Sequence, residues 1–367
     1  MDIVKLKDLT VDGKGTYGVA APAVEYQENL PTYLRITDIL DDGTLNLSEL
    51  KSVKVPDSKR YMLRPNDIVF ARTGGSTGRN YFYDGTDGAF VYAGFLIKFS
   101  LDPKKVNPKF IKYFCQSEQY KQWVRSFNTG STRGNINAQT FGNMEIALPG
   151  RKQQDHLVSV LESMGKKIKL NKKINDNLQQ QAQAIYTSMF INNADPAWRQ
   201  GHLSDLITVK YGKDHKKLSD GCYPVYGSGG IMRYVERPLY DKESVLIPRK
   251  GTLNNVIYVN QPFWSVDTMF YTEMRLPNVA KYVFHFIKSK DLASMNAGSA
   301  VPSMTTDILN AIEVAIPSAQ DLEKFETLVS PLYRAVQENN IQSAKLAELR
   351  DTLLPKLMSG ELDVSNI

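Results

Sequence analysis

Glu145-Ile-Ala-Leu-Pro149 recurs as Glu313-Val-Ala-Ile-Pro317, inside a repeat that aligns Ser126–Phe190 with Ser294–Met358 without a gap. The matched stretch begins in a polar loop, continues through a strand that ends at proline, and enters a long amphipathic segment. Upstream, a shorter echo at a different offset pairs Asp67-Ile-Val-Phe-Ala-Arg-Thr-Gly74 with Ser244-Val-Leu-Ile-Pro-Arg-Lys-Gly251. Chance similarity between amphipathic helices does not explain the matched loop and strand. The repeat therefore predicts a pseudo-two-fold molecule with two similar but non-identical surfaces.

Each long matched segment ends in a heptad pattern. In the first copy the apolar residues follow alternating steps of four and three, and the same register passes through Asn171 and Asn175. This pattern is typical of a coiled-coil seam. About 40 helical residues at 1.5 Å each span about 60 Å, which favours a spacer helix. The residues expected to pair the two helices are Leu157, Leu161, Met164, Ile168, Asn171, Leu178, Val329, Leu332, Val336, Asn339 and Leu346.

We expect these helices to pair antiparallel with Asn171 beside Asn339. Both residues lie midway along their segments, and a pseudo-two-fold axis brings the midpoints of two equivalent antiparallel helices together. A polar residue on an apolar seam fixes the register at some cost in stability. Pro331 lies inside the second segment. It is expected to kink or interrupt that helix near Ser330, because proline removes a helix hydrogen bond.

Four segments follow from the repeat: residues 1–149, 150–193, 194–317 and 318–367. The expected fold is α+β, with two globular mixed α/β domains separated by two long antiparallel coiled-coil-like helices. Short apolar runs bounded by glycine, proline and Asp-Gly turns predict strands in both globular segments. These runs are Tyr33–Ile39, Asp67–Ala71, Ala89–Phe99, Ser244–Ile247 and Val256–Val259. Amphipathic helices are expected at 107–127 and 279–295.

Length and composition favour a soluble protein of two to three domains. The chain has 367 residues, of which 42% are hydrophobic and 23% charged. It has no apolar run near the ~20 residues that a membrane helix needs, and its first residues lack the apolar region of a signal peptide. We therefore expect a cytoplasmic protein without a membrane partner. Cys115 and Cys222 have no Cys or His at ligand spacing, which argues against a zinc knuckle and a disulfide framework.

The net charge of +6 is unevenly distributed. The first heptad segment carries seven basic and three acidic residues, whereas the second carries five basic and eight acidic. Helices of opposite sign suit pairing with each other or with different partner surfaces. The globular segments are mildly basic, which suits a polyanion without proving one.

Catalytic motifs are absent from the sequence. The chain has no Pro-Pro dipeptide, which the target-binding loop of an amino-methyltransferase requires. Gly227-Ser-Gly229 does not extend to a dinucleotide-binding motif, and Thr73–Arg79 lacks the Gly-Lys-[Ser/Thr] ending of a phosphate-binding loop. The four histidines form no catalytic or metal-binding pattern. We therefore expect no catalytic residues, no metal and no cofactor in this chain.

Polar, glycine-rich loops stand at equivalent places in both halves. Arginine and asparagine form bidentate pairs with guanine and adenine edges, while Lys, Ser and Thr commonly bind phosphate. Such loops can also be simple turns, but their recurrence with changed polar residues favours a DNA-reading surface. The expected DNA-binding residues are Arg35, Arg72, Thr73, Arg79, Asn80, Ser131, Arg133, Asn135 and Asn137 in the first half, and Tyr226, Ser228, Arg249, Lys250, Asn254, Asn255 and Ser299 in the second.

Together, these features resemble the specificity subunit of a type I restriction–modification system over essentially the whole chain. The resemblance rests on the two repeats and on several motifs. These motifs are Tyr33–Ile39, Asp67–Gly74, Tyr223–Gly230, Phe263–Thr268 and Leu349–Glu361.

In that family, two target-recognition domains alternate with two antiparallel helices. The resemblance implies that each domain reads one half of a bipartite target in double-stranded DNA and that the helices fix the spacer. It also implies partners: two modification subunits that use S-adenosylmethionine for adenine-N6 methylation, and restriction subunits that use ATP and Mg²⁺. Apolar residues outside the seam, such as Val160, Ile174, Leu349 and Leu354, are expected to dock the modification subunits.

Two alternatives remain open at this point. The chain could be an enzyme such as a free-standing methyltransferase, which binding of S-adenosylmethionine by the isolated chain would reveal. It could also be a protein–protein scaffold, which an absence of DNA binding at low salt would favour.

Overall fold

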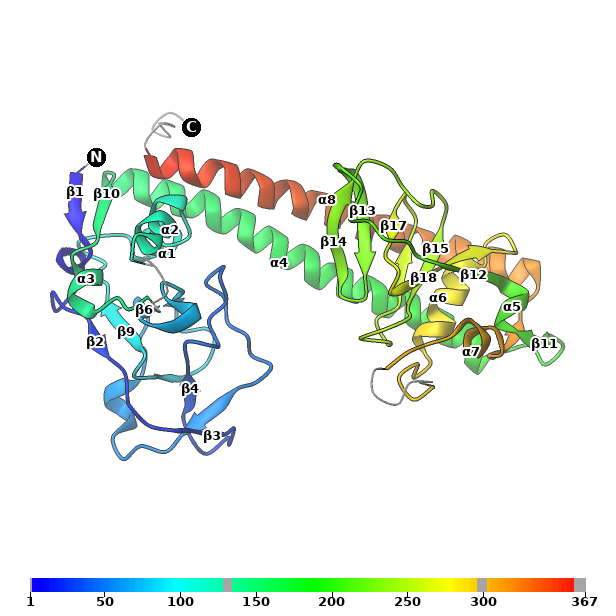
Figure 1. Ribbon diagram of the computed structural model, residues 1–367, viewed down its shortest axis with the longest axis horizontal. Helices are drawn as coiled ribbons and strands as arrows, with labels where there is room; N and C mark the ends of the chain where they lie inside the picture. The colour runs from blue at the N-terminus through cyan, green and yellow to red at the C-terminus, as the bar shows by residue number, and fades with distance from the viewer. Residues whose placement is uncertain (1, 128–133, 296–301, 360–367) are drawn as a thin grey trace. The chain divides into compact units, whose positions relative to one another are not determined.

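The computed structural model describes residues 2–127, 134–295 and 302–359 (Figure 1). The chain forms two compact units, of which the first comprises Met1–Leu170 with Gln342–Ile367 and the second comprises Asn171–Ile341. Each unit contains mixed sheets, short helices and part of both long helices. The expected α+β composition, with a long helix between two repeated domains, is confirmed.

The first unit contains a two-stranded sheet and two four-stranded sheets. One four-stranded sheet has the order β2 (Thr16–Tyr17), β9 (Leu96–Ser100), β6 (Asp67–Ala71) and β7 (Asn80–Tyr83). The other has the order β3 (Ala23–Glu25), β5 (Lys51–Val53), β4 (Thr32–Leu34) and β8 (Phe90–Tyr92). The two-stranded sheet pairs β1 (Asp2–Lys5) with β10 (Glu145–Leu148).

The second unit repeats this plan in shorter form. Its four-stranded sheet has the order β12 (Ile207–Tyr211), β18 (Met269–Met274), β15 (Ser244–Pro248) and β16 (Ile257–Val259). A second sheet has the order β14 (Gly230–Val235), β13 (Asp220–Gly227) and β17 (Trp264–Ser265), and β11 (Arg199–His202) pairs with β19 (Glu313–Ile316).

Equivalent sequence motifs occupy equivalent places in these sheets. The two copies of the upstream echo form β6 and β15, which each pair with two neighbouring strands. Their side chains are buried, as the apolar runs require. The repeated Glu-x-Ala-x-Pro motif supplies β10 and β19, with Leu148 opposite Asp2 and Ile316 opposite Arg199. The sequence repeat is thus a repeat of topology.

Short helices differ from the expectation in their lengths. The single helix expected at 107–127 is two, α1 (Pro108–Phe114) and α2 (Glu118–Arg125), because the Ser117 hydroxyl accepts a hydrogen bond from Tyr120 N and starts a new helix. Helix α6 (Ala280–Lys288) ends before the expected residue 295. Single-turn helices were not expected; they are α3 (Ala138–Gly142), α5 (Leu203–Leu206) and α7 (Thr306–Asn310). Three 3-10 turns are Leu6–Leu9, Ser58–Tyr61 and Gly74–Ser76.

Two long helices continue through both units. Helix α4 (Arg151–Thr187) has 37 residues and ends in a π-helical turn, Ser188–Asn192, and helix α8 (Ala319–Ser359) has 41 residues. The expected interruption at Pro331 is wrong, since α8 is unbroken there. Proline removes one main-chain hydrogen bond, and the neighbouring Phe325, Val329 and Leu332 belong to or pack against the hydrophobic core of the second unit.

The seam residues of α4 and α8 are buried or half-buried at the spacing that the sequence predicts. Within the first unit, Leu157 and Leu161 lie in the core of the globular part, and Leu353 of α8 packs against the same core. Within the second unit, Tyr186 and Phe190 join the other core. The remaining seam residues Met164, Ile168, Leu178, Leu332, Val336 and Leu346 are half-buried, whereas Val329 is fully buried.

Asparagines connect the helices inside the second unit. Asn171, fully buried, donates from Nδ2 to the main-chain oxygen of Asn339 at 3.3 Å, at the place that the repeat predicts. Asn339 Nδ2 donates to Asn175 Oδ1 at 2.9 Å, and Asn175 Nδ2 donates to Asn340 Oδ1 at 2.8 Å. The helices run antiparallel here, since Tyr186, further along α4, lies against the earlier residue Phe325 of α8.

Helix α6 is held against both long helices by His285. Its Nδ1 lies 2.8 Å from Gln183 Oε1 on α4, and its Nε2 lies 2.9 Å from the Tyr333 hydroxyl on α8. Burial, with a smaller contribution from Lys288, lowers the pKa of this histidine to about 4. The imidazole is therefore neutral at pH 7 and connects three helices.

Replacing Asn171 with alanine should lower the free energy of unfolding by about 1–3 kcal/mol, because buried polar groups lose their hydrogen-bond partners. Asn177→Ala is the matched control, since Asn177 is exposed on the same helix and should change stability by no more than about 0.5 kcal/mol. Urea denaturation followed by circular dichroism measures both. Equal losses in the free energy of unfolding of the two variants would contradict the structural role assigned to the hydrogen-bonded asparagines between α4 and α8.

Candidate nucleic-acid interface

In each unit the chain brings the two predicted reading loops together. In the first unit, Ile136 N donates to Arg72 O at 2.9 Å, and Thr73 forms a β-bridge with Asn135. In the second unit, Met304 N donates to Arg249 O at 2.9 Å, and Lys250 forms a β-bridge with Ser303. Loops from distant parts of the sequence therefore meet in the same way twice.

Each of these arginines lies over an exposed tyrosine from the edge strand of the same sheet. The Arg72 guanidinium carbon is 5.2 Å from the ring centre of Tyr17 on β2, and that of Arg249 is 5.4 Å from the ring centre of Tyr211 on β12. These distances are in the range of cation–π interactions, which fix the plane of a guanidinium. Tyr17 and Tyr211 are 42% and 52% exposed, whereas both arginines are half-buried.

A glycine follows each tyrosine because the chain passes very close to another strand. A methyl group at Gly18 would lie 2.2 Å from the Tyr92 carbonyl oxygen, and one at Gly212 would lie 2.0 Å from the Val266 carbonyl oxygen. Gly18 N and Gly212 N donate to Leu96 O and Met269 O at 3.2 and 3.0 Å. The Tyr17-Gly18 and Tyr211-Gly212 dipeptides were missed in the sequence; the recurrence of Tyr-Gly, where β2 and β12 end, was the available signal.

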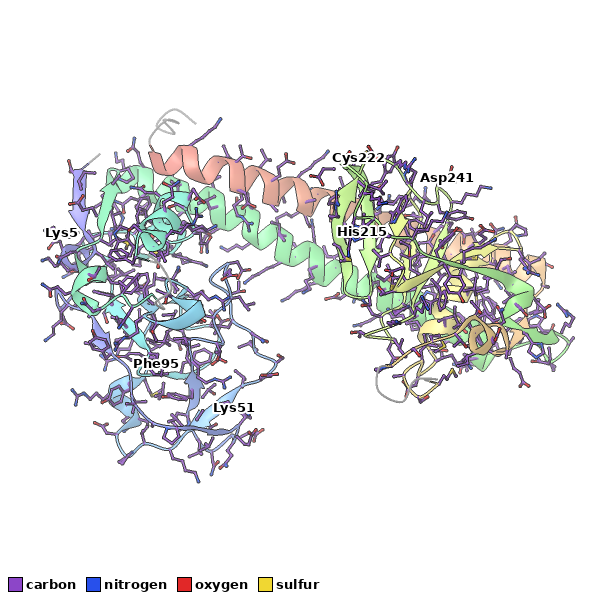
Figure 2. The ribbon with its side chains drawn as sticks, in the orientation of Figure 1. Lys5, Lys51, Phe95, His215, Cys222 and Asp241 are labelled. Atoms are coloured by element: carbon purple, nitrogen blue, oxygen red, sulfur yellow. The ribbon has the colours of Figure 1, made fainter. Side chains whose placement is uncertain are left out.

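A tight turn completes the arrangement beside each arginine. Arg72 N donates to Phe95 O at 3.0 Å, and Arg249 N donates to Thr268 O at 2.9 Å. Phe95, labelled in Figure 2, is 59% exposed, whereas Thr268 is half-buried. Neither residue was among the expected DNA-binding residues.

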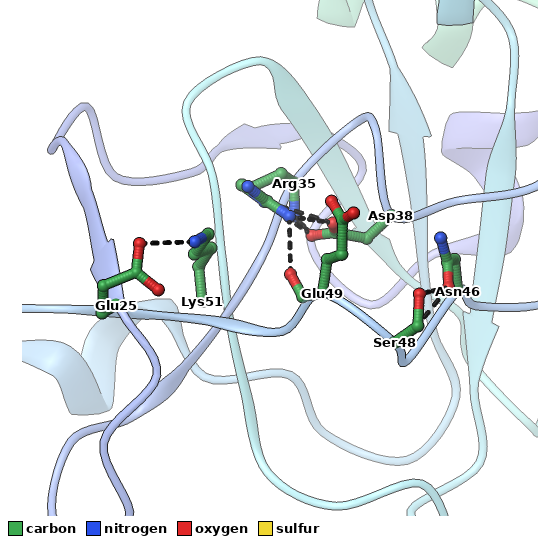
Figure 3. Close-up of polar contacts among 7 residues, drawn as sticks. All are labelled: Glu25, Arg35, Asp38, Asn46, Ser48, Glu49 and Lys51. Atoms are coloured by element: carbon green, nitrogen blue, oxygen red, sulfur yellow. Dashed lines mark hydrogen bonds and ion pairs between the residues drawn. The ribbon is translucent and has the colours of Figure 1, made fainter. Parts of the chain in front are cut away.

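Two expected DNA-binding arginines are engaged in ion pairs within the first unit. Arg35 binds Asp38 at 2.5 Å and donates to Glu49 O at 3.0 Å, as Figure 3 shows beside the Lys51–Glu25 ion pair. Hydrogen bonding to Asp38, chiefly, raises the pKa of Arg35. Arg79 binds the exposed Asp41 at 2.7 Å and donates to Ile39 O. Contacts of Arg35 and Arg79 with DNA remain predictions.

Asn80 and Tyr226 are not surface residues, contrary to expectation. Each is 8% exposed. Asn80 Nδ2 donates to Gly78 O and Cys115 O at 3.4 and 3.3 Å, while Tyr226 belongs to a hydrophobic core of the second unit. Both residues stabilise the frame behind the loops, because a buried amide needs acceptors and a buried ring needs apolar neighbours.

Several other expected DNA-binding residues form hydrogen bonds within the loops or cap the short helices that follow them. Asn137 caps α3 by accepting from Thr140 N, and Thr305 caps α7 at the equivalent place by accepting from Ile308 N. Asn254 bonds to Asp291 and to Ala293 N, and Asn255 Nδ2 donates to Ser228 O at 2.6 Å. Lys250 and Asn135 are exposed, whereas Thr73 is half-buried. Ser131, Arg133 and Ser299 lie outside the described residues.

Within the part of the chain that the structure describes, no helix is long and apolar enough to cross a membrane. The same residues contain no cluster of three or more histidine, cysteine, aspartate or glutamate side chains that could hold a metal ion.

A family model described as the type I restriction modification DNA specificity domain matches residues 3–180 and 197–346. The chain belongs to this family. This specificity protein therefore serves DNA target recognition in a type I restriction–modification system, as its sequence resemblance predicted.

Named relatives agree with the family match. The specificity protein is 20% identical to the type I restriction enzyme HindI specificity subunit of Haemophilus influenzae, over 90% of this chain and 94% of the relative. It is 20% identical to the MjaIX specificity subunit of Methanocaldococcus jannaschii, over 71% and 70% of the two chains. A crystal structure of a type I restriction–modification S subunit from M. genitalium shares the fold, with a TM-score of 0.61, 19% identity and coverage of 99% and 96%.

Alanine at Gly18 or Gly212 should destabilise the specificity protein by about 1–3 kcal/mol, because the added methyl group overlaps a backbone oxygen. It should also weaken DNA binding by displacing the adjacent tyrosine. Gly150→Ala is the matched control, since a methyl group there meets nothing within 4 Å and Gly150 lies outside the predicted DNA-binding loops. Thermal unfolding and a DNA-binding titration measure the two effects; unchanged stability in Gly212→Ala would contradict the close approach.

Proposed function

We propose that this chain is the non-catalytic subunit that selects the DNA sequence for a type I restriction–modification complex, with each globular domain reading one half of a bipartite target. The observation that carries the proposal is the double occurrence of one interface. Arg72 and Arg249 each lie over a tyrosine, and the main-chain oxygen of each accepts a hydrogen bond from a residue of the second polar loop. One frame with different polar residues suits the reading of two different half-sequences.

The residues proposed to lie at the DNA are in the loops on this frame. Arg133, Asn135 and Asn137 with Arg72 and Arg79 would serve the first half-target, and Arg249, Lys250, Asn254, Asn255 and Ser299 the second. If Arg133 makes a bidentate base contact, Arg133→Ala should cost about 1–3 kcal/mol and relax specificity in one half-target only. Replacement of a phosphate-binding Lys250 should instead weaken binding to all sequences alike.

Helices α4 and α8 would set the spacing between the half-targets and dock two modification subunits. Seam residues are buried or half-buried, while Ile174 and Leu349 remain 37% and 50% exposed and Val160 is half-buried. Exposed apolar side chains on a helix suit a protein partner. The side chain of Leu354 lies outside the described residues.

The catalytic reactions would be carried out by the partner subunits. Modification subunits would bring S-adenosylmethionine and methylate adenine, and restriction subunits would use ATP and Mg²⁺ for translocation and cleavage. Co-expression with the modification subunits should accordingly give a soluble complex that binds double-stranded DNA.

Exchange of residues 1–149 for the first domain of another specificity protein tests the modular reading. The exchange should change one half of the methylated sequence and leave the other half and the spacer intact, because the second unit keeps its own loops. Adenine methylation mapped by single-molecule sequencing measures the outcome, and exchange of residues 194–317 is the reciprocal control. A change in both halves after one exchange would show that the domains do not read independently.

A further inference from the structure

The two interfaces differ in a systematic way. Residues of the frame are the same in both, namely the arginine, the tyrosine and the glycine after it. Neighbouring residues at equivalent places differ: Phe95 corresponds to Thr268, Thr73 to Lys250 and Asn135 to Ser303. A residue kept in both domains suits a DNA feature that both half-targets share, and a residue that differs suits a feature that distinguishes them.

We propose that the arginine–tyrosine pair of each domain binds a phosphate of the DNA backbone, and that the turn residue beside it, Phe95 or Thr268, reads a base. Phe95 contacts the C5-methyl group of a thymine in the first half-target. This inference rests on the proposed function, because it assumes that both interfaces face DNA.

The arginine is suited to phosphate by its placement. Its main chain is fixed on both sides, since Arg72 N donates to Phe95 O and Arg72 O accepts from Ile136 N. Its guanidinium lies over the Tyr17 ring with Nε buried, so the two terminal nitrogens are the donors available to a bidentate anion. In the second domain, Arg249 Nη1 donates to Asp267 O at 3.2 Å, which leaves the remaining nitrogens for the anion. The sugar–phosphate backbone is common to any two half-targets, and phosphate contacts position a protein without reading sequence.

The turn that carries Phe95 is rigid. Gly94 N donates to Val19 O at 2.8 Å, Leu96 N donates to Ala93 O at 2.8 Å, and Phe95 O accepts from Arg72 N at 3.0 Å. The Phe95 side chain is nevertheless 59% exposed. A rigid, solvent-facing ring next to a phosphate-binding arginine suits a contact with a base edge.

Chemistry identifies the base feature. Phenylalanine has no hydrogen-bonding group, so the atoms that it can select are apolar. In the major groove the thymine methyl group is the apolar feature of a base pair, and phenylalanine and the threonine methyl group both contact it in known recognition. Thr268 adds a hydroxyl group, so it can read a different base edge in the second half-target.

Binding of the complex with its modification subunits tests the phosphate contact. The probes are a fluorescent duplex with the mapped target and a scrambled duplex of equal length, each titrated at several salt concentrations. Arg72→Ala and Arg249→Ala should each weaken binding to both probes by the same factor and lower the salt slope by about one. Tyr211→Phe keeps the ring and should bind normally, whereas Tyr211→Leu should behave like a partial loss of Arg249.

Arg60 supplies the matched control, because it also forms an arginine–tyrosine pair but lies outside the predicted DNA-binding loops. Its guanidinium carbon is 5.8 Å from the ring centre of Tyr61, on the Ser58–Tyr61 turn. Arg60→Ala should change neither affinity nor salt slope. A loss of affinity in Arg72→Ala that is confined to the target duplex, or an equal loss in Arg60→Ala, would overturn the phosphate assignment.

Deoxyuridine tests the base contact. Replacing one thymine of the first half-target with deoxyuridine removes only the methyl group and should weaken binding of the unaltered complex about fourfold, which corresponds to ~0.8 kcal/mol for one buried methyl. Phe95→Ala should abolish this difference, while Thr268→Ala should preserve it. If no thymine in the first half shows the effect, or if Phe95→Ala retains it, the assignment of Phe95 is wrong.

Failure of the proposed function and failure of this inference would give different results. An unaltered complex that does not prefer its mapped target over the scrambled duplex contradicts the proposed function. A complex that prefers its target, but whose Arg72, Arg249 and Phe95 variants bind as the unaltered complex does, contradicts this inference alone.

Discussion

Burial of the long helices in the cores of both units is the constraint on which the rest of the structure depends. Leu157 and Leu161 of α4 are part of the first globular core, and Tyr186 and Phe190 near its end are part of the second. Neither globular part has a complete core without residues of the helix. The helix is therefore a structural element of both units, and each candidate interface is built on a core to which the helix contributes.

Within each unit, backbone geometry fixes the interface more than side-chain identity does. Gly18 and Gly212 admit a close approach of strands that no side chain would permit, and the arginine carbonyls hold the loop that follows. Because main-chain hydrogen bonds supply the frame, side chains such as Phe95 and Thr268 can differ without changing it. One main-chain frame can therefore carry different side chains in the two units.

Much of this organisation could be predicted from the sequence, because a repeat constrains many residues at once. The strand Asp67–Ala71 and the contact between Asn171 and Asn339 follow directly from the aligned copies. Features that depend on competing local interactions were harder to predict. Ser117 starts a second helix where the periodicity predicts a single continuous helix. Pro331 stays inside α8, because packing of the helix outweighs one lost hydrogen bond.

The candidate site was predicted less completely than the fold. Residue type alone cannot distinguish Asn80, whose amide is buried against main-chain acceptors, from the exposed Asn135. It also cannot reveal the Arg72–Tyr17 pair, since the two residues come from different strands and meet only through sheet pairing. Tertiary pairing, rather than local pattern, decides which polar residues reach the surface together.

The central claim is that two domains of one chain read two parts of one DNA target. Adenine methylation mapped across the genome of cells with and without this gene tests it most directly. The account predicts a methylated sequence made of two specific parts separated by a gap of fixed length, which disappears when the gene is removed. A methylation pattern that is unchanged by removal of the gene, or one that consists of a single continuous sequence, would contradict it.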